Sequence, residues 1–267
     1  MNKKENDNQN SLVIDVQSLF IPLSVIVVGV MISGALYFGL KSSNNSSNSV
    51  NDKVSAGTVK DEDAAAAPDD VPDETTIATT SIDDDPIMGN KDSAKVAIIE
   101  FADYECPFCQ RHFEETLGDI KEKYIDTGKA IYVYRDLPLS FHDPAATDEA
   151  QAAECVQDLA GDDAYFKYHD LIFENTKANG EGVGGADKLA KLASQVGLDV
   201  GAFNDCFDSE KFKEEVEKDA SDAQSASISG TPGFVIGLLQ DDGTVEGTVI
   251  RGAFPFSEFE RVIDDLI

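Results

Sequence analysis

The sequence predicts an α/β domain that carries a helical insertion and follows a single membrane-spanning helix. Three observations support this prediction. Apolar runs of strand length occur at 95–102, 130–135, 234–239 and 244–250, and a helical pattern follows the first of them. A long stretch of helical pattern, at about 144–228, separates the second strand region from the third. Near the N-terminus, an apolar run is long enough to cross a bilayer.

The composition excludes some classes of protein. The chain of 267 residues has 51 acidic and 21 basic side chains, for a formal net charge of −30. Such a surface repels phosphate backbones, so we expect no nucleic-acid partner. A hydrophobic fraction of 42% with 15 phenylalanines is enough to build a core, and 4 cysteines are too few for a disulfide-stapled scaffold of this length.

The first element is an apolar run from Leu19 to Leu40 that contains no charged residue. A helix of about 20 residues spans the bilayer core, whereas the apolar region of a secretory signal has only ~7–15 residues. The length therefore predicts an uncleaved transmembrane anchor at 19–40, with cleavage near Ser33-Gly34-Ala35 as the alternative. Lysines lie on both sides of the run, so the positive-inside rule only weakly favours a cytoplasmic N-terminus at 1–18.

Residues 41–85 are expected to form a disordered linker. They begin with a polar run of Ser and Asn and continue with acidic sequence rich in Ala and Pro. No period of 2 or 3.6 is present, and too few residues are apolar to offset the entropy lost on ordering. We expect this linker to hold a folded domain, residues 86–267, away from the membrane.

From residue 86 onward the pattern is that of a folded domain without internal repeats. The helix after the first strand has Phe113, Leu117, Ile120 and Tyr124 at helical spacing. Near the C-terminus, Asp241-Asp242-Gly243 between two strand-like runs predicts a hairpin. The expected elements are a strand at Lys95–Ala102, a helix at Pro107–Asp126, a strand at Ala130–Arg135, the helical insertion at about 144–228, a hairpin at Phe234–Ile250 and a last helix at Ser257–Ile267.

The strongest chemical signal is Cys106-Pro107-Phe108-Cys109, which follows a buried strand and begins an amphipathic helix. Unpaired N–H groups and the positive helix end stabilise a thiolate at the first cysteine. Pro107 suits the first helical position, where its missing N–H has no partner to lose. The motif predicts a redox pair. A metal site that adds His112 is the alternative, but no second Cys or His pair nearby completes a four-ligand set.

The stretch Glu100–Cys109, together with Gly230-Thr231-Pro232-Gly233, resembles the DsbA-like branch of the thioredoxin superfamily, and more closely its membrane-anchored BdbD type. The resemblance covers about residues 88–267. It implies a thioredoxin-like fold and thiol–disulfide exchange with protein substrates. It also implies that Cys106 is the exposed nucleophile, that Cys109 is the buried resolving thiol, and that Pro232, after Thr231, is a cis-proline that lies against the disulfide.

Glu100 is the third residue to which the resemblance gives a role. It shares a face of the strand with Val96, Ile98 and Ala102, where a carboxylate is unfavourable unless it is paired or functional. The family has an acid at this position, beneath the resolving cysteine, where it can accept and return the proton of that thiol. A partly exposed glutamate at the strand end is the alternative.

The remaining cysteines and histidines lie in the helical block or at its entrance. Cys155 and Cys206 are expected to form a structural disulfide in an oxidising compartment, with two inert buried thiols as the alternative. His142 precedes the block and lies near the expected active site. For both His142 and His169, a packed structural role is favoured over a chemical one.

The resemblance implies an oxidase that gives disulfides to secreted or surface proteins. Phe108 replaces the histidine of the best-known family member, which argues for a milder potential, and Thr231 also occurs in reductase and isomerase relatives, so these directions stay open. A tethered metal-binding protein and a structural domain with an inert disulfide are further alternatives. We expect no cofactor and no metal, and no loop matches a dedicated Ca²⁺ motif. We also expect a monomer on the extracytoplasmic side of the cell membrane, reoxidised by a membrane redox partner.

Overall fold

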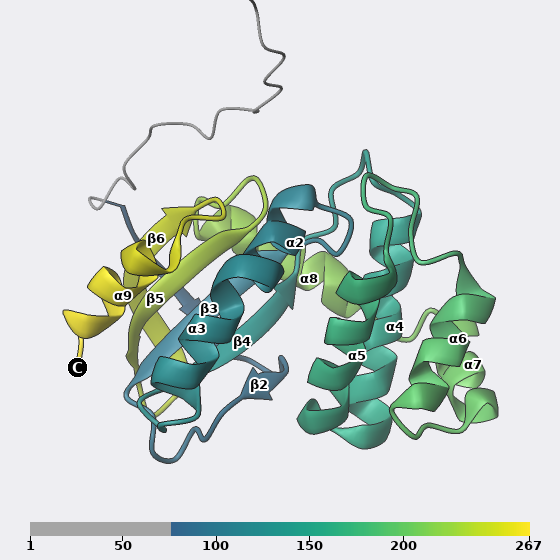
Figure 1. Ribbon diagram of the computed structural model, residues 1–267, viewed down its shortest axis with the longest axis horizontal. Helices are drawn as coiled ribbons and strands as arrows, with labels where there is room; N and C mark the ends of the chain where they lie inside the picture. Colours follow the sequence, from purple (N-terminus) through teal and green to yellow (C-terminus); the bar gives the residue numbers. More distant parts are fainter. Residues whose placement is uncertain (1–75) are drawn as a thin grey trace, which may run out of the picture. The chain divides into compact units, whose positions relative to one another are not determined.

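The computed structural model describes residues 76–267, which contain a six-stranded sheet in the order β1-β6-β5-β3-β4-β2. Figure 1 shows this sheet with helices on both faces and a group of helices beside it. β3 and β4 are parallel, and the other neighbours are antiparallel. The strands are β1 (Ile77–Ser81), β2 (Ile87–Met88), β3 (Val96–Ala102), β4 (Ala130–Asp136), β5 (Gly233–Leu239) and β6 (Thr244–Arg251).

β3 forms where the sequence predicts a buried strand, and every residue of it is buried. Its side chains alternate between the two faces of the sheet. Val96 and Ile98 belong to the larger core on one face, and Ala97 and Ile99 belong to the smaller core on the other. β3 is a central strand that lies between β4 and β5. The loop that follows its carboxyl end therefore lies near the middle of the sheet's width.

A continuous helical segment follows that loop and covers the face of the larger core. It consists of α2 (Pro107–His112), η2 (Phe113–Leu117), α3 (Gly118–Ile120) and η3 (Lys121–Ile125). The two η stretches are π-helical, whereas the sequence spacing predicts an ordinary α-helix. α9 (Phe256–Asp264) contributes Phe259 to the same core. α8 (Lys213–Ser225) covers the opposite face through Ala223.

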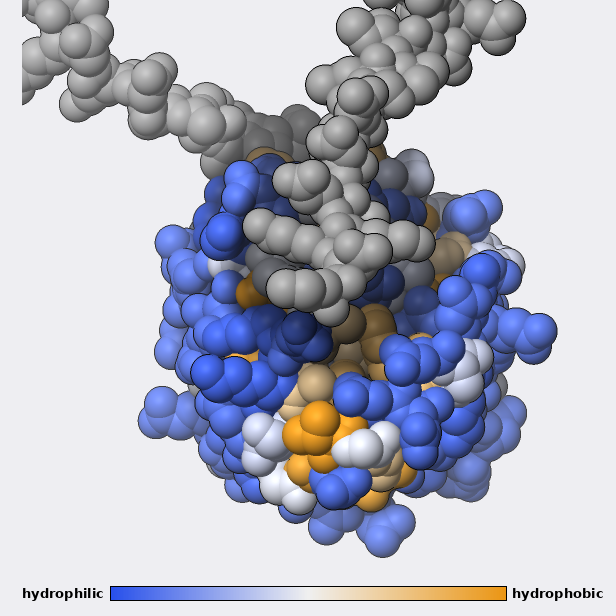
Figure 2. Space-filling view, turned by 90° about the vertical axis from the view of Figure 1, so that its right-hand side faces the viewer, coloured by the Kyte–Doolittle hydropathy of each residue, from blue (hydrophilic) through white to orange (hydrophobic). Residues whose placement is uncertain are grey.

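The predicted helical insertion is confirmed between β4 and β5. It contains α4 (Ala145–Ala160), α5 (Asp162–Asn175), α6 (Ala186–Gln195) and α7 (Val200–Asp208), followed by α8. Figure 1 shows α4 to α7 grouped beyond the β4 side of the sheet. Cys155 of α4 and Cys206 of α7 form a disulfide, with their Cα atoms 6.0 Å apart. Figure 2 shows this side of the molecule as mostly hydrophilic, with an apolar patch low in the view.

The expected end of the linker at residue 85 is wrong. Ile77–Ser81 forms β1, an edge strand that pairs with β6, and Asp85 is buried against Arg135. Backbone hydrogen bonds and this ion pair order the segment, so it needs none of the apolar periodicity on which a strand prediction depends. The last helix also ends at Asp264, earlier than predicted.

The predicted anchor at 19–40, and the expected linker as far as residue 75, lie outside the described residues. Within residues 76–267, none of the helices is long and apolar enough to cross a membrane.

Candidate active site

The loop from β3 to α2 places Cys106 immediately before the helical segment. Cys106 is the N-cap residue of α2, with an extended backbone, and Pro107 occupies the first helical turn. The N–H of Cys106 donates to the carbonyl oxygen of Asp103 over 3.0 Å, which closes the loop tightly. Cys106 and Cys109 are both free thiols. This geometry directs the unpaired N–H groups of the first helical turn toward the Cys106 sulfur.

The segment before β5 lies against the same sulfur. β3 and β5 pair with Phe101 opposite Gly233, so the residues that precede Gly233 lie beside the loop that follows Phe101. The Thr231–Pro232 peptide bond is cis. The Cys106 Sγ lies 3.4 Å from the Thr231 carbonyl oxygen, to which the thiol donates. Two segments far apart in the sequence therefore meet at one sulfur atom.

Cys106 is more covered than the resemblance implies. It is 4% exposed, against 1% for Cys109, whereas Phe108 between them is 52% exposed. The expectation of an exposed Cys106 is therefore wrong in the reduced state described here. The physical reason is the backbone around the cis Thr231–Pro232 bond, which lies over the sulfur.

The pKa values of the two thiols are shifted in opposite directions. A hydrogen bond from the Cys109 side chain, helped by the Thr231 side chain and by the N–H groups of Cys109 and Phe108, lowers the pKa of Cys106 to about 6, although burial opposes this. Burial and the neighbouring Cys106 raise the pKa of Cys109 well above its ordinary value. Since the thiolate is the reactive species, Cys106 is the nucleophile that this geometry favours.

We expect the Cys106 thiolate to titrate near pH 6 in the reduced protein. The folded-state pKa lies below the ordinary thiol value of 9.0, so the stabilisation of the reduced state is complete above about pH 9 and is lost as the pH falls through about 6. The ultraviolet absorbance of the thiolate measures this transition. In Cys106→Ser the low transition should disappear, because the remaining thiol of Cys109 ionises only at high pH. A midpoint above pH 8 in the unsubstituted chain contradicts the prediction.

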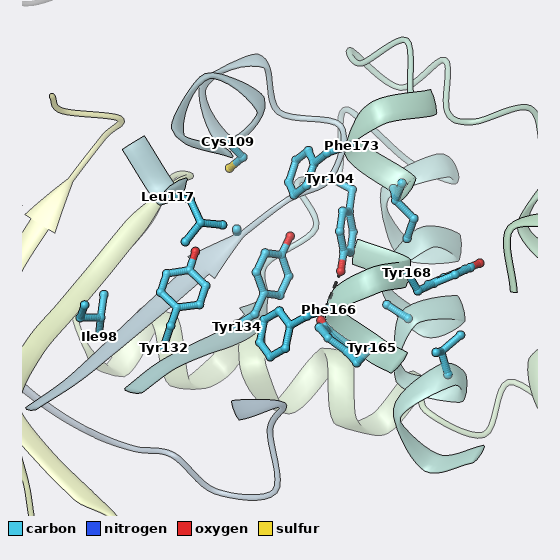
Figure 3. Close-up of a cluster of buried hydrophobic side chains, with 14 of the residues drawn as sticks. Ile98, Tyr104, Cys109, Leu117, Tyr132, Tyr134, Tyr165, Phe166, Tyr168 and Phe173 are labelled. Atoms are coloured by element: carbon cyan, nitrogen blue, oxygen red, sulfur yellow. Dashed lines mark hydrogen bonds between the residues drawn. The ribbon is translucent and has the colours of Figure 1, made fainter. Parts of the chain in front are cut away.

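A buried acid lies in the core beneath these cysteines. Glu100 is 2% exposed and belongs to the same face of β3 as Ile98, as its strand position predicts. The Tyr132 hydroxyl donates to its carboxyl group. Burial, followed by the charge of Cys106, raises the pKa of Glu100 well above its ordinary value. Figure 3 shows the hydroxyl ends of Tyr132 and Tyr134 directed toward the end of the core where Cys109 lies.

Asp103 organises the loop, and the sequence assigns it no role. Its Oδ1 accepts the N–H of Glu105 over 2.7 Å, and its Oδ2 accepts the N–H of Leu139 over 2.8 Å. The same Oδ2 lies 2.7 Å from Nδ1 of His142. The active-site loop and the segment that enters the insertion are therefore held together by one carboxyl group. An acid directly after a buried strand is the sequence signal that points to it.

Glu105 makes a second connection that the sequence does not suggest. It is fully buried, and its carboxylate accepts hydrogen bonds from the Thr176 hydroxyl and, over 2.9 Å, from the N–H of Gly182. Its own carbonyl oxygen accepts the N–H of Asn179 over 2.8 Å. The loop between α5 and α6 is thus fixed to the residue immediately before Cys106.

The histidines do not join the cysteines. His112 is 1% exposed and packs with its ring centroid 4.7 Å from that of Phe234, and burial lowers its pKa to about 3. The clusters of potential metal ligands among residues 76–267 consist of carboxylates alone, so Cys106, Cys109 and His112 are not assembled into one. His169 lies in an aromatic cluster, beside the rings of residues such as Phe173.

A helix that begins with an acidic thiol, a buried partner thiol three residues later and a cis-proline beside them define a thiol–disulfide oxidoreductase of the α/β class. The family model described as thioredoxin matches residues 81–265, and the chain belongs to this family. Its relatives and structural neighbours place it in the DsbA-like group of disulfide oxidoreductases.

Two curated relatives and one solved structure illustrate the similarity. The probable disulfide bond formation protein D of Bacillus cereus is 30% identical over 175 residues, which cover 60% of this chain and 80% of the relative. Disulfide bond formation protein D of Bacillus subtilis is 29% identical over 187 residues, which cover 69% of this chain and 78% of the relative. The crystal structure of oxidised BdbD from Bacillus subtilis has a TM-score of 0.61 at 25% identity, covering 70% of this chain and 95% of that one.

Proposed function

We propose that this protein is an extracytoplasmic oxidase that introduces disulfides into secreted or surface proteins through Cys106 and Cys109. The observation that carries the direction is the low pKa of Cys106, about 6, beside a buried partner with a raised pKa. A thiolate that is stable at neutral pH makes the reduced enzyme the favoured product, and this is the property of an oxidant.

In the proposed reaction a substrate thiolate attacks the Cys106 sulfur of the Cys106–Cys109 disulfide. The S–S bond breaks, a mixed disulfide forms at Cys106, and Cys109 leaves as a thiolate that takes a proton from Glu100. A second substrate thiolate then attacks the substrate sulfur of the mixed disulfide. Cys106 leaves as a thiolate, and the substrate departs with its new disulfide. The two electrons of the substrate dithiol remain on the enzyme until a membrane partner removes them.

Replacing Glu100 by glutamine is expected to slow the oxidation of the reduced protein about 10- to 100-fold at neutral pH. Cys109 must lose its proton in that reaction, and the substitution removes the only carboxyl group that we assign to accept it. The deficit should shrink as the pH rises, since hydroxide then supplies the base. Stopped-flow rates with oxidised glutathione measure this. Tyr132→Phe is the matched variant, because it keeps the carboxyl group and removes its hydrogen-bond donor. An equal deficit at every pH contradicts a relay.

The cellular setting is part of the proposal. The apolar run at 19–40 serves as the anchor, and the linker after it positions a monomeric domain outside the cytoplasm. The Cys155–Cys206 disulfide supports an oxidising compartment. Cys106 is the nucleophile and Cys109 the resolving thiol. Pro232 and the carbonyl group of the preceding Thr231 present backbone atoms to a bound peptide.

The reduction potential of the full chain, equilibrated against glutathione, tests the direction. A value toward about −120 mV, the figure for a strong disulfide donor, supports the oxidase. A value near the thioredoxin figure of about −270 mV indicates a reductase and overturns the proposal. An intermediate value accompanied by the reshuffling of scrambled disulfides indicates an isomerase.

A further inference from the structure

A groove of about 350 Å³ lies directly beside the redox pair. Phe108 and Thr231 form the part of its lining that adjoins the cysteines, and Phe254 and Pro255 form its apolar side. Thr231 is also the residue whose carbonyl oxygen lies 3.4 Å from the Cys106 sulfur. A chain segment in this groove would therefore be continuous with a cysteine that reacts at Cys106. This groove, which Arg111 and Arg251 also line, is named the arginine groove.

The lining of this groove is positively charged, whereas the chain as a whole is strongly negative. The chain has a formal net charge of −30 and contains only four arginines. Arg135 and Arg261 form ion pairs. The other two, Arg111 and Arg251, both line the arginine groove, and none of the other described residues in its lining carries a carboxylate. Arg111 also lines a neighbouring depression along α2 and its continuation, and the acids in that lining are Glu115 and Asp119.

Within residues 76–267, both guanidinium groups donate to backbone carbonyl groups and pair with no acid, and Arg251 Nη1 also lies 3.5 Å from the Thr76 hydroxyl oxygen. Arg111 Nη2 donates to the carbonyl oxygen of Ala253 over 2.8 Å, and its guanidinium carbon lies 5.1 Å from the centroid of the exposed Phe108 ring. Arg251 Nε and Nη2 donate to the carbonyl oxygen of Ser227 over 3.1 and 3.0 Å. A neutral acceptor leaves the positive charge uncompensated, so each group is fixed in position and still able to bind a carboxylate.

We propose that the arginine groove selects substrate segments that carry an acidic side chain close to the reacting cysteine. The proposal rests on the proposed function, since it concerns the substrate of the same site. The carboxylate of the substrate would lie between Arg111 and Arg251, and its apolar neighbours would pack on Phe108 and Phe254. An acidic protein repels such a segment at long range. The two arginines reverse the sign of the local potential at the one place where the segment must dock.

A pair of synthetic peptides tests this directly. They share one sequence with a single cysteine and differ only in the residues that flank it, which are glutamates in one peptide and lysines in the other. The measured quantity is the rate at which each peptide reduces the disulfide of the oxidised full chain in a single turnover. Each rate is divided by the thiolate fraction of that peptide, because flanking charges change the pKa of its cysteine.

In low salt we expect the acidic peptide to react about three- to tenfold faster than the basic one, as two partly exposed ion pairs allow. The preference should fall to about one in the double variant Arg111→Gln, Arg251→Gln, and should largely return with lysine at both positions. A matched control, Arg261→Gln with Lys191→Gln, removes the same charge outside the groove lining and should keep the preference. High salt should reduce it.

Two results would overturn the proposal. One is a preference for the basic peptide in the unsubstituted chain, and the other is an acidic preference that the groove variant and the control lose equally. Reduction by dithiothreitol keeps this test separate from that of the proposed function, because it needs no groove. If dithiothreitol reduces a Cys106–Cys109 disulfide but neither peptide reacts, the oxidase itself fails.

Discussion

Cys106→Ser should lose all disulfide exchange, while Cys109→Ser should keep one half of the reaction. Serine cannot form a disulfide, so the first variant has no route to a mixed disulfide, and its rate should fall to that of the uncatalysed reaction. In Cys109→Ser the Cys106 sulfur loses the Cys109 thiol but keeps the Thr231 side chain and the backbone N–H groups that lower its pKa, so it still attacks a disulfide as a thiolate. The mixed disulfide then persists, because no resolving thiol follows it.

Mass spectrometry after exposure to oxidised glutathione distinguishes the two variants. Cys109→Ser should carry one glutathione in nearly every molecule at neutral pH. Cys106→Ser should carry none, since its remaining thiol, Cys109, is 1% exposed and has a raised pKa. The disulfide between Cys155 and Cys206 is unchanged in both variants and does not react. A stable adduct on Cys106→Ser would mean that the assigned roles of Cys106 and Cys109 are reversed.

Arg135→Met is expected to reduce the free energy of unfolding by about 3–5 kcal/mol, the largest effect on stability that we predict. The Arg135 side chain is completely buried. It lies 2.9 Å from Asp85 and 2.5 Å from Asp219, and its Nη1 also donates to the carbonyl oxygen of Ser81 over 3.3 Å. One guanidinium group therefore joins β4, α8 and the segment after β1. Methionine fills a similar volume but leaves buried acids without a cation.

Urea denaturation of the reduced and oxidised protein measures this loss. Lys123→Met is the matched control, because Lys123 pairs with Glu260 over 2.6 Å at the surface, where both side chains are more than one third exposed. An exposed pair contributes at most about 1 kcal/mol, so the control should change the unfolding free energy only slightly. Equal losses in the two variants would show that Arg135 acts through no buried charge network.

The sequence was sufficient to predict the helices and strands whose own residues carry a clear hydrophobic periodicity. Cys106, Pro107 and Cys109 lie where a strand pattern changes to a helix pattern, and the long helical insertion follows from periodicity alone. Features that depend on distant partners have no local signal. β1 is ordered by pairing with β6, across most of the length of the domain, and its own sequence resembles the polar linker before it.

In the candidate site, too, some residues have a local sequence signal and others depend on distant partners. Glu100 was predictable, because a carboxylate on the buried face of a strand is unusual wherever it occurs. Its partner Tyr132 was not, since an aromatic residue on a buried strand is an ordinary core residue until the register of the sheet is known. Asp103 and Glu105 likewise acquire their roles from Leu139 and Gly182, which only the folded chain brings within hydrogen-bonding distance.

If the proposed function holds, the Cys155–Cys206 disulfide would make this protein a substrate of its own reaction. A newly synthesised chain carries four thiols, and only the pair in the active site has to cycle. The other pair needs to be oxidised only once, and under the proposed function finished copies of the same enzyme would be suitable donors. The first molecules then need a foreign oxidant, and each one that matures adds to the capacity for maturing the next. The accumulation of functional protein would therefore be autocatalytic, with a lag that shortens as the starting amount of mature enzyme increases.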